Sequence, residues 1–200
     1  EILKQMKILV IQTAFLGDAV LTLPMIQKLK EKNPKCNITV LCIPSTKDLF
    51  VNSNCVDNVI EYDKKHSQKS ILNYIKLVLS LRKLEFDIAV SPHRSTRSTL
   101  LCKFSGAAIT IGFNTASLSF LYRKIIKYNK EFHEVMRNLS LIEEDIDSLD
   151  WRIVPELKDS YLVKNKIELF VKKLPEKKII AVAPGSVWQT KVYPMENFVL

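Results

Sequence analysis

Short apolar, β-branched runs alternate with amphipathic stretches along this chain, and that alternation constrains the fold more than any other feature. The first runs are Lys7–Gln12 and Ile38–Ile43, and residues 19–32 between them carry apolar side chains at helical spacing. Runs that are apolar at successive positions are typical of strands buried on both faces. We therefore predict an α/β fold, with helices flanking a parallel sheet and right-handed crossovers. The same patterns predict further strands at 58–62, 87–91 and 109–112 and further helices at 69–83, 96–104 and 131–141.

The pattern changes after Asp150, where we predict a domain boundary. Trp151–Pro155 is an extended, proline-ended segment, and the residues beyond it predict a helix at 158–173, a strand at 177–183 and a helix with Pro194 in its first turn. The predicted domains are therefore residues 1–155 and 156–200. Because the last predicted helix is still running at residue 200, and the first residue is Glu rather than Met, we expect a piece of a longer protein with a truncated second domain.

Composition and hydropathy exclude several classes of protein. With 47% hydrophobic and 26% charged residues, the chain is typical of a globular domain rather than a disordered segment. It has no apolar run near the length of about 18 residues that suggests a spanning helix. Gln12 and Asp18 interrupt an N-terminal stretch that otherwise resembles a signal peptide, so we expect a cytoplasmic protein. The four cysteines lack Cys-x-x-Cys and zinc-site spacings, so we expect reduced thiols and no metal site.

Positive charge is concentrated in one stretch of the sequence. The formal net charge is +9, and nine of the 30 Lys and Arg residues lie between residues 64 and 103, against only Glu85 and Asp87. Such a stretch attracts anions, so nucleic acid, anionic lipid and phosphorylated saccharides all fit its charge, as does a simple solvated surface. No nucleic-acid-binding module or aromatic stacking platform accompanies it, and we therefore predict no nucleic-acid partner.

Two segments far apart in the sequence carry the residues that suggest chemistry. Phe15–Asp18 and Ala183–Lys191 each follow a short β-branched run, so each is predicted to form a loop at the carboxyl end of a strand, where open α/β sheets bind ligands. One segment offers a carboxylate and the other a cation with hydroxyl groups, which suits transfer of a group from a phosphorylated donor to a hydroxyl. The glycine fingerprints of dinucleotide-binding enzymes and of P-loop NTPases are absent, which disfavours both classes.

Four sequence blocks in order resemble glycosyltransferase family 9, the lipopolysaccharide heptosyltransferases, across nearly the whole chain. The first block joins Lys7–Ile11, Leu16–Asp18 and Thr22–Pro24. The other blocks are Phe86–Val90 with Arg97–Ser98, Ser105–Ala107 and Ile111–Phe113; then His133–Leu139; and last Ala183–Ser186 with Trp188, Thr190–Lys191 and Pro194.

The resemblance implies a metal-independent, cofactor-free glycosyltransferase of the GT-B architecture that inverts configuration at the transferred sugar carbon. Members of the family transfer heptose from ADP-heptose to the inner core of lipopolysaccharide. Their N-terminal Rossmann-like domain holds the acceptor, and a second Rossmann-like domain holds most of the nucleotide sugar. The alternative from a different class is a non-catalytic protein on the same scaffold that binds a phosphosugar or an anionic lipid, because fold alone does not decide between them.

Asp18 is the candidate general base, a role that the family assigns to this position, with Gly17 beside it at the acceptor. An Asp at this place also suits an N-cap or a helix-dipole partner of the following helix. Pro24 is poorly tolerated inside a helix, which would move the regular helix start to Thr22 and leave Asp18 on the loop. Both interpretations of Asp18 remain open from the sequence.

Lys191, Ser186, Thr190 and Gly185 are the candidate donor-binding residues, because a cation, hydroxyls and backbone amides stabilise a diphosphate leaving group. A flexible surface loop is the alternative. Val192-Tyr193 departs from the usual family pattern before the proline, although Lys191 itself matches.

His93, Arg94 and Arg97 are the candidate acceptor-binding residues, since Arg binds carboxylates and phosphates in bidentate fashion. A helix start with solvated arginines explains the same residues. His133 is either functional or a structural residue that ties a helix to the sheet. The basic charge also suits a peripheral enzyme that meets lipid-anchored acceptors at the cytoplasmic face of a membrane.

Overall fold

The computed structural model describes residues 5–63, 70–146, 148–158, 161–175, 180, 185 and 192–198. The chain divides into two compact units, Glu1–Lys158 and Asp159–Leu200. The sequence placed the domain boundary after residue 155, and the assignment of acceptor and donor binding to the two parts stays a prediction. Each unit is described by itself below.

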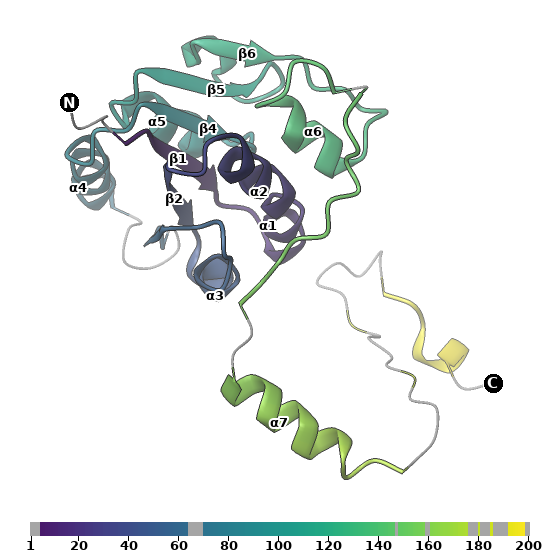
Figure 1. The fold of residues 1–200 in the computed structure, drawn as a ribbon. Helices are drawn as coiled ribbons and strands as arrows, with labels where there is room; N and C mark the ends of the chain where they lie inside the picture. The colour runs from purple at the N-terminus through teal and green to yellow at the C-terminus, as the bar shows by residue number, and fades with distance from the viewer. Residues whose placement is uncertain are drawn as a thin grey trace. The chain divides into compact units, whose positions relative to one another are not determined.

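The first unit is built on a six-stranded parallel sheet with the order β3-β2-β1-β4-β5-β6 (Figure 1). Its strands are β1 (Lys7–Gln12), β2 (Asn37–Cys42), β3 (Asn58–Glu61), β4 (Ile88–Ser91), β5 (Ile109–Phe113) and β6 (Lys124–Ile126). The order reverses between β1 and β4, which is the doubly wound arrangement of the Rossmann fold. The predicted α/β class and parallel sheet are therefore confirmed. The sequence missed β6, because three residues are too few to show a pattern.

Helices connect the strands, and their number exceeds the prediction. The first unit contains α1 (Leu16–Val20), α2 (Leu23–Lys32), α3 (Lys47–Val51), α4 (Ile71–Arg82), α5 (Thr96–Phe104) and α6 (Glu134–Ser140), with 3₁₀ turns η1 (Pro44–Thr46) and η2 (Ser119–Leu121). The single helix predicted over 19–32 is wrong. It is two helices, and Pro24 stands in the first turn of the second, where its missing N–H costs nothing. The sequence did not show α3, which is one turn long.

The two faces of the sheet bury separate apolar clusters. Along β1, Ile8 and Val10 belong to the cluster that contacts α1, α2, α3 and α6, whereas Leu9 and Ile11 belong to the cluster beneath α4 and α5. Alternate residues of a strand point to opposite faces, so burial of both sets makes the strand apolar throughout. The helices thus cover both faces, as Figure 1 shows for α2 and α6 against α5.

The second unit contains α7 (Tyr161–Val171), within the predicted helix 158–173. The helix predicted from Pro194 is observed as a 3₁₀ turn, η4 (Met195–Phe198). The strand predicted at 177–183 lies outside the described residues.

In the described part of the chain, no helix is both long and apolar enough to cross a bilayer. The four cysteines are free thiols, and burial raises the pKa of Cys102 to about 12 and that of Cys42 to about 11.

Gly112 in β5 lies directly beneath the Tyr122 ring, and this contact predicts a stability effect. A Cβ at Gly112 would overlap the Tyr122 ring, which is itself 5% exposed and held by a 3.0 Å bond from its hydroxyl to Thr99 Oγ1. We expect Gly112→Ala to lower the free energy of unfolding by about 1–3 kcal/mol, measured by urea denaturation. Gly17→Ala is the matched control, because nothing lies within 4 Å of its Cβ position. Equal stability of the two variants would contradict the close packing.

Candidate functional site

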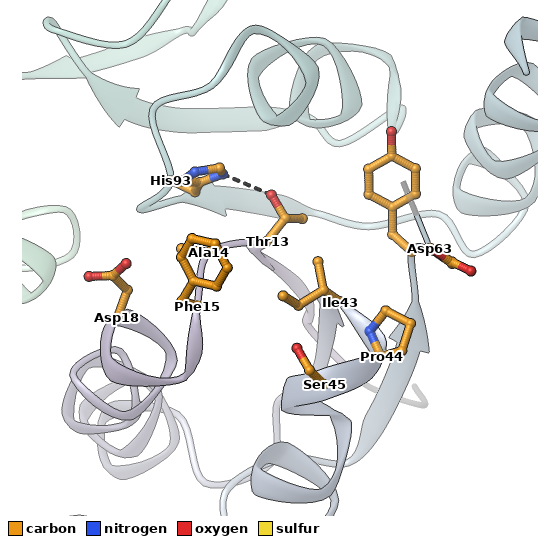
Figure 2. Close-up of a pocket in the computed structure, with 10 residues that line it drawn as sticks. Thr13, Ala14, Phe15, Asp18, Ile43, Pro44, Ser45, Asp63 and His93 are labelled. Atoms are coloured by element: carbon orange, nitrogen blue, oxygen red, sulfur yellow. Dashed lines mark hydrogen bonds between the residues drawn. The ribbon is translucent and has the colours of Figure 1, made fainter. Parts of the chain in front are cut away.

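A pocket of about 370 Å³ opens at the carboxyl ends of β1, β2, β3 and β4. In a doubly wound sheet, the crevice at the carboxyl edge beside the point where the strand order reverses is the usual ligand site. Figure 2 shows Asp18 at one end of the pocket and Asp63 at the other, with His93 and Thr13 between them. The pocket is lined by Thr13, Ala14, Phe15, Asp18, Ile43, Pro44, Ser45, Tyr62, Asp63 and His93.

The predicted helix start at Thr22 is confirmed, because Thr22 is the N-cap of α2. Asp18 is nevertheless not on a loop, since it lies in the separate short helix α1. It is the third residue of α1, in the first turn, and its exposed side chain lines the pocket. Phe15 rather than Asp18 is the N-cap residue, so the N-cap interpretation is wrong, whereas the place of Asp18 in the first turn agrees with a helix-dipole partner. A carboxylate in the first turn of a helix interacts favourably with the helix dipole. Gly17, the other predicted residue here, is exposed beside it.

Gln12 and Thr22 hold the backbone of α1, a role that the sequence did not indicate. Gln12 Nε2 donates to Thr22 Oγ1 at 2.6 Å and to the Asp18 carbonyl oxygen at 3.4 Å, and Thr22 Oγ1 donates to the same carbonyl at 2.8 Å. Both side chains are at least 97% buried. The only sequence signal was a polar residue at the end of an apolar strand, which is typical of a buried hydrogen-bond network. The network fixes the helix that presents Asp18 to the pocket.

Thr22 therefore yields a prediction. Thr22→Val keeps the shape of the side chain but removes the hydroxyl that donates to the Asp18 carbonyl and accepts from Gln12. We expect it to lower the free energy of unfolding by about 1–2 kcal/mol, because these two buried groups lose their hydrogen-bond partner. Displacement of α1 should also lower the turnover of the full-length protein several-fold. Thr22→Ser keeps the hydroxyl and is the matched control for both measurements. Wild-type turnover in Thr22→Val would show that the network does not position Asp18.

α6 also holds the connection between α1 and α2. Asn138 Nδ2 donates to the Leu21 carbonyl at 2.9 Å, in the short connection between α1 and α2. His133 is the N-cap of α6, where its Nδ1 accepts from the Val135 N–H at 3.3 Å, and its ring stacks on Trp151 at 4.9 Å. These contacts favour the structural interpretation of His133 over the functional one.

His93 lies in the loop after β4 and joins three hydroxyl groups. Its Nδ1 is 2.8 Å from Thr13 Oγ1, 3.0 Å from Ser98 Oγ and 3.4 Å from Ser95 Oγ. Ser95 is also the N-cap of α5, since its side chain accepts from the Ser98 N–H at 3.3 Å. The structure thus places His93 at the pocket that Asp18 also lines. The hydrogen bond between His93 and Thr13, drawn in Figure 2, links the loop after β4 to the loop after β1.

Arg94 and Arg97 are exposed but do not line this pocket. The guanidinium of Arg94 lies 4.3 Å over the ring of Tyr128, and Arg137 lies 4.9 Å over the same ring. Arg97 is in the first turn of α5, and its carbonyl accepts from Tyr74 Oη at 3.2 Å. The two arginines are therefore neighbours of the pocket along the chain, and their role at an acceptor stays a prediction.

Of the predicted donor-binding residues, Ser186, Thr190 and Lys191 lie outside the described residues. Gly185 is described and exposed, in the second unit. The assignment of these residues to donor binding therefore rests on the sequence alone. Among the described residues, no group of three or more His, Cys, Asp or Glu side chains is placed to hold a metal ion.

The strand order and the pocket at its reversal define a doubly wound α/β domain, and solved glycosyltransferases share this fold. A glycosyl transferase family 9 structure from Veillonella parvula has a TM-score of 0.81 and 22% identity, covering 96% of this chain and 58% of that one. The E. coli ADP-heptose lps heptosyltransferase II has a TM-score of 0.69 and 23% identity, with 86% and 52% covered. The E. coli heptosyltransferase WaaC with ADP has a TM-score of 0.65 and 17% identity, with 96% and 62% covered.

The sequence itself matches the model of glycosyltransferase family 9 (heptosyltransferase) over residues 74–199, and the chain belongs to that family. The family resemblance found in the sequence is therefore confirmed. No curated protein matches the sequence. The chain spans between 52% and 62% of the length of the three solved structures.

Proposed function

We propose that the full-length protein is an inverting, metal-independent glycosyltransferase that transfers heptose from ADP-heptose to a hydroxyl of the lipopolysaccharide inner core. The observation that carries the proposal is the side chain of Asp18 in a pocket at the β1–β4 reversal, in a chain of glycosyltransferase family 9. The structural neighbours support a nucleotide-sugar donor, because one was solved with ADP and another is described as an ADP-heptose enzyme.

The reaction follows from one displacement at the sugar carbon. The Asp18 carboxylate takes the proton of the acceptor hydroxyl, whose oxygen forms a bond to the anomeric carbon from the side opposite the diphosphate. The bond between that carbon and the diphosphate oxygen breaks, and ADP leaves with the electron pair. A single attack of this kind inverts the configuration. Lys191, Ser186, Thr190 and the backbone at Gly185 stabilise the charge that grows on the diphosphate.

The acceptor is proposed to meet His93, Arg94, Arg97 and the Gly17 backbone. The inner core carries carboxylates and phosphates, which Arg binds in bidentate fashion. The proposed location is cytoplasmic, at the inner face of the cytoplasmic membrane, where a lipid-anchored acceptor is presented. Arg94 and Arg137, whose guanidinium groups lie over the Tyr128 ring, would attract such an anionic acceptor.

A mass-spectrometric transfer assay on the full-length protein tests the proposal. ADP-heptose and other nucleotide sugars are offered with a truncated lipopolysaccharide acceptor. We expect the acceptor to gain the mass of one heptose from ADP-heptose only. Measurable nucleotide-sugar binding with no product from any donor would overturn the proposal in favour of a non-catalytic binding protein.

A further inference from the structure

The outer face of α4 exposes an unusual amount of apolar surface. Ile71 is 78% exposed, Leu72 is 72%, Ile75 is 46% and Leu79 is 53%. The inner face of the same helix is also apolar, because Leu77 and Leu81 are buried in the core. A helix that only covers a sheet normally presents polar residues to water. Apolar side chains grouped on one exposed face indicate an interaction surface.

Cations accompany these apolar side chains. Lys76, Arg82 and Lys83 are all exposed, and the helix Ile71–Arg82 contains no acidic residue. We call the seven residues Ile71, Leu72, Ile75, Lys76, Leu79, Arg82 and Lys83 the α4 outer face. Its combination of aliphatic side chains and uncompensated positive charge is complementary to a surface that is apolar inside and negatively charged outside.

The α4 outer face is connected to the pocket. The ring of Tyr62, which lines the pocket, packs edge-on against the ring of Tyr74 on α4, with centroids 6.3 Å apart. Tyr74 Oη donates to the Arg97 carbonyl at 3.2 Å, so the first turns of α4 and α5 lie together. α4 follows β3, and its first residues therefore lie at the same edge of the sheet as the pocket.

We infer that the α4 outer face docks onto an anionic lipid bilayer. The aliphatic side chains enter the interface between headgroups and acyl chains, and the three cations bind anionic headgroups. A second copy of the chain is a poorer occupant, because a symmetric contact through this face would place cations against cations. Docking at α4 would hold the edge of the sheet that carries the pocket near the membrane. The advantage of this placement rests on the proposed function, in which the acceptor is lipid-anchored.

Vesicle co-sedimentation of the full-length protein tests the apolar contribution. The probes are vesicles of phosphatidylcholine with phosphatidylglycerol, compared with phosphatidylcholine alone. We expect binding to the anionic vesicles and a loss of about tenfold in Leu72→Gln/Ile75→Gln. Val154→Gln is the matched control, because Val154 is 80% exposed while its neighbour Ile153 packs on the opposite face of the sheet. We expect this control to bind as the wild type does.

The charge contribution is tested in the same way. Lys76→Gln/Lys83→Gln is expected to lose about tenfold or more in binding to anionic vesicles and to flatten the dependence of binding on salt. Lys28→Gln/Lys35→Gln removes one lysine of α2 and one of the turn between α2 and β2, and we expect it to behave as wild type apart from a small general effect of net charge.

Three results would overturn the inference. They are undiminished vesicle binding in both α4 double variants, failure of the wild type to bind anionic vesicles, and self-association through α4 detected by light scattering. The proposed function is judged separately, by transfer to a water-soluble core oligosaccharide, on which the α4 variants should retain wild-type turnover. Vesicle binding that depends on α4 would stand even if no transfer were found.

Discussion

Replacing Asp18 with Asn in the full-length protein lowers kcat about 100-fold to 10,000-fold and leaves the affinity for ADP-heptose nearly unchanged. The amide is close in size to the carboxylate but cannot accept the proton of the acceptor hydroxyl, and loss of a general base typically costs that much. α1 should form as before, because the hydrogen bonds from Gln12 and Thr22 end on the Asp18 carbonyl, which the substitution keeps. Steady-state kinetics and a separate measurement of donor binding check both parts.

Asp63→Asn is the matched control, because Asp63 is a second carboxylate that lines the same pocket, at the end away from Asp18 (Figure 2). We expect it to change KM for the acceptor more than kcat. A comparable fall of kcat in both variants would mean that general electrostatics rather than a base at residue 18 drives the reaction. An unchanged rate in Asp18→Asn would remove Asp18 from the mechanism.

The central strands were predictable because burial on both faces makes them largely apolar, as in Ile8–Ile11 of β1, which are all buried. β1 was predicted to the residue, and β2 to within one residue at each end. The apolar runs also implied a sheet covered on both sides, which the two clusters of β1 side chains confirm. Elements of one turn or three residues, such as α3 and β6, have too few positions for a period to show.

Asp18 and His93 line one pocket because each follows a strand of the parallel sheet, and parallel strands end at the same edge. The sequence did not show the hydrogen bonds from Gln12 to Thr22 and on to the Asp18 carbonyl, which depend on how α1 and α2 break. Pro24 correctly indicated the helix start at Thr22, but the short helix α1 before it was missed, because a proline limits where a helix starts without saying what precedes it.

The sequence also concealed the outer face of α4. The residues of this helix are apolar on both sides, so the pattern predicted a helix at 69–83 without indicating which side meets the core. Packing of Leu77 and Leu81 beneath the helix leaves Leu72 and Leu79 outside. Only tertiary structure separates the two sets, since both satisfy the same helical spacing.

Replacing Lys191 with Ala should lower kcat/KM for the nucleotide sugar about 10-fold to 100-fold, equivalent to about 1.5–3 kcal/mol for one charge-assisted contact. The charge on the diphosphate grows as the bond to the sugar breaks, so the loss should appear in kcat as well as in donor binding. This pattern differs from that of Asp18→Asn, where donor affinity is retained. Competition with ADP separates the two cases, because Lys191→Ala should also bind free ADP more weakly.

Lys173→Ala is the matched control for Lys191→Ala, because Lys173 is an exposed lysine of the second unit outside the candidate donor-binding set. We expect wild-type kinetics from it, since a solvated lysine far from a phosphate contributes little. Lys191→Arg should recover part of the activity, because it keeps the charge but changes the shape of the contact. Identical kinetics in Lys191→Ala and Lys173→Ala would assign Lys191 to a solvated surface loop, and the leaving group would then need another source of positive charge.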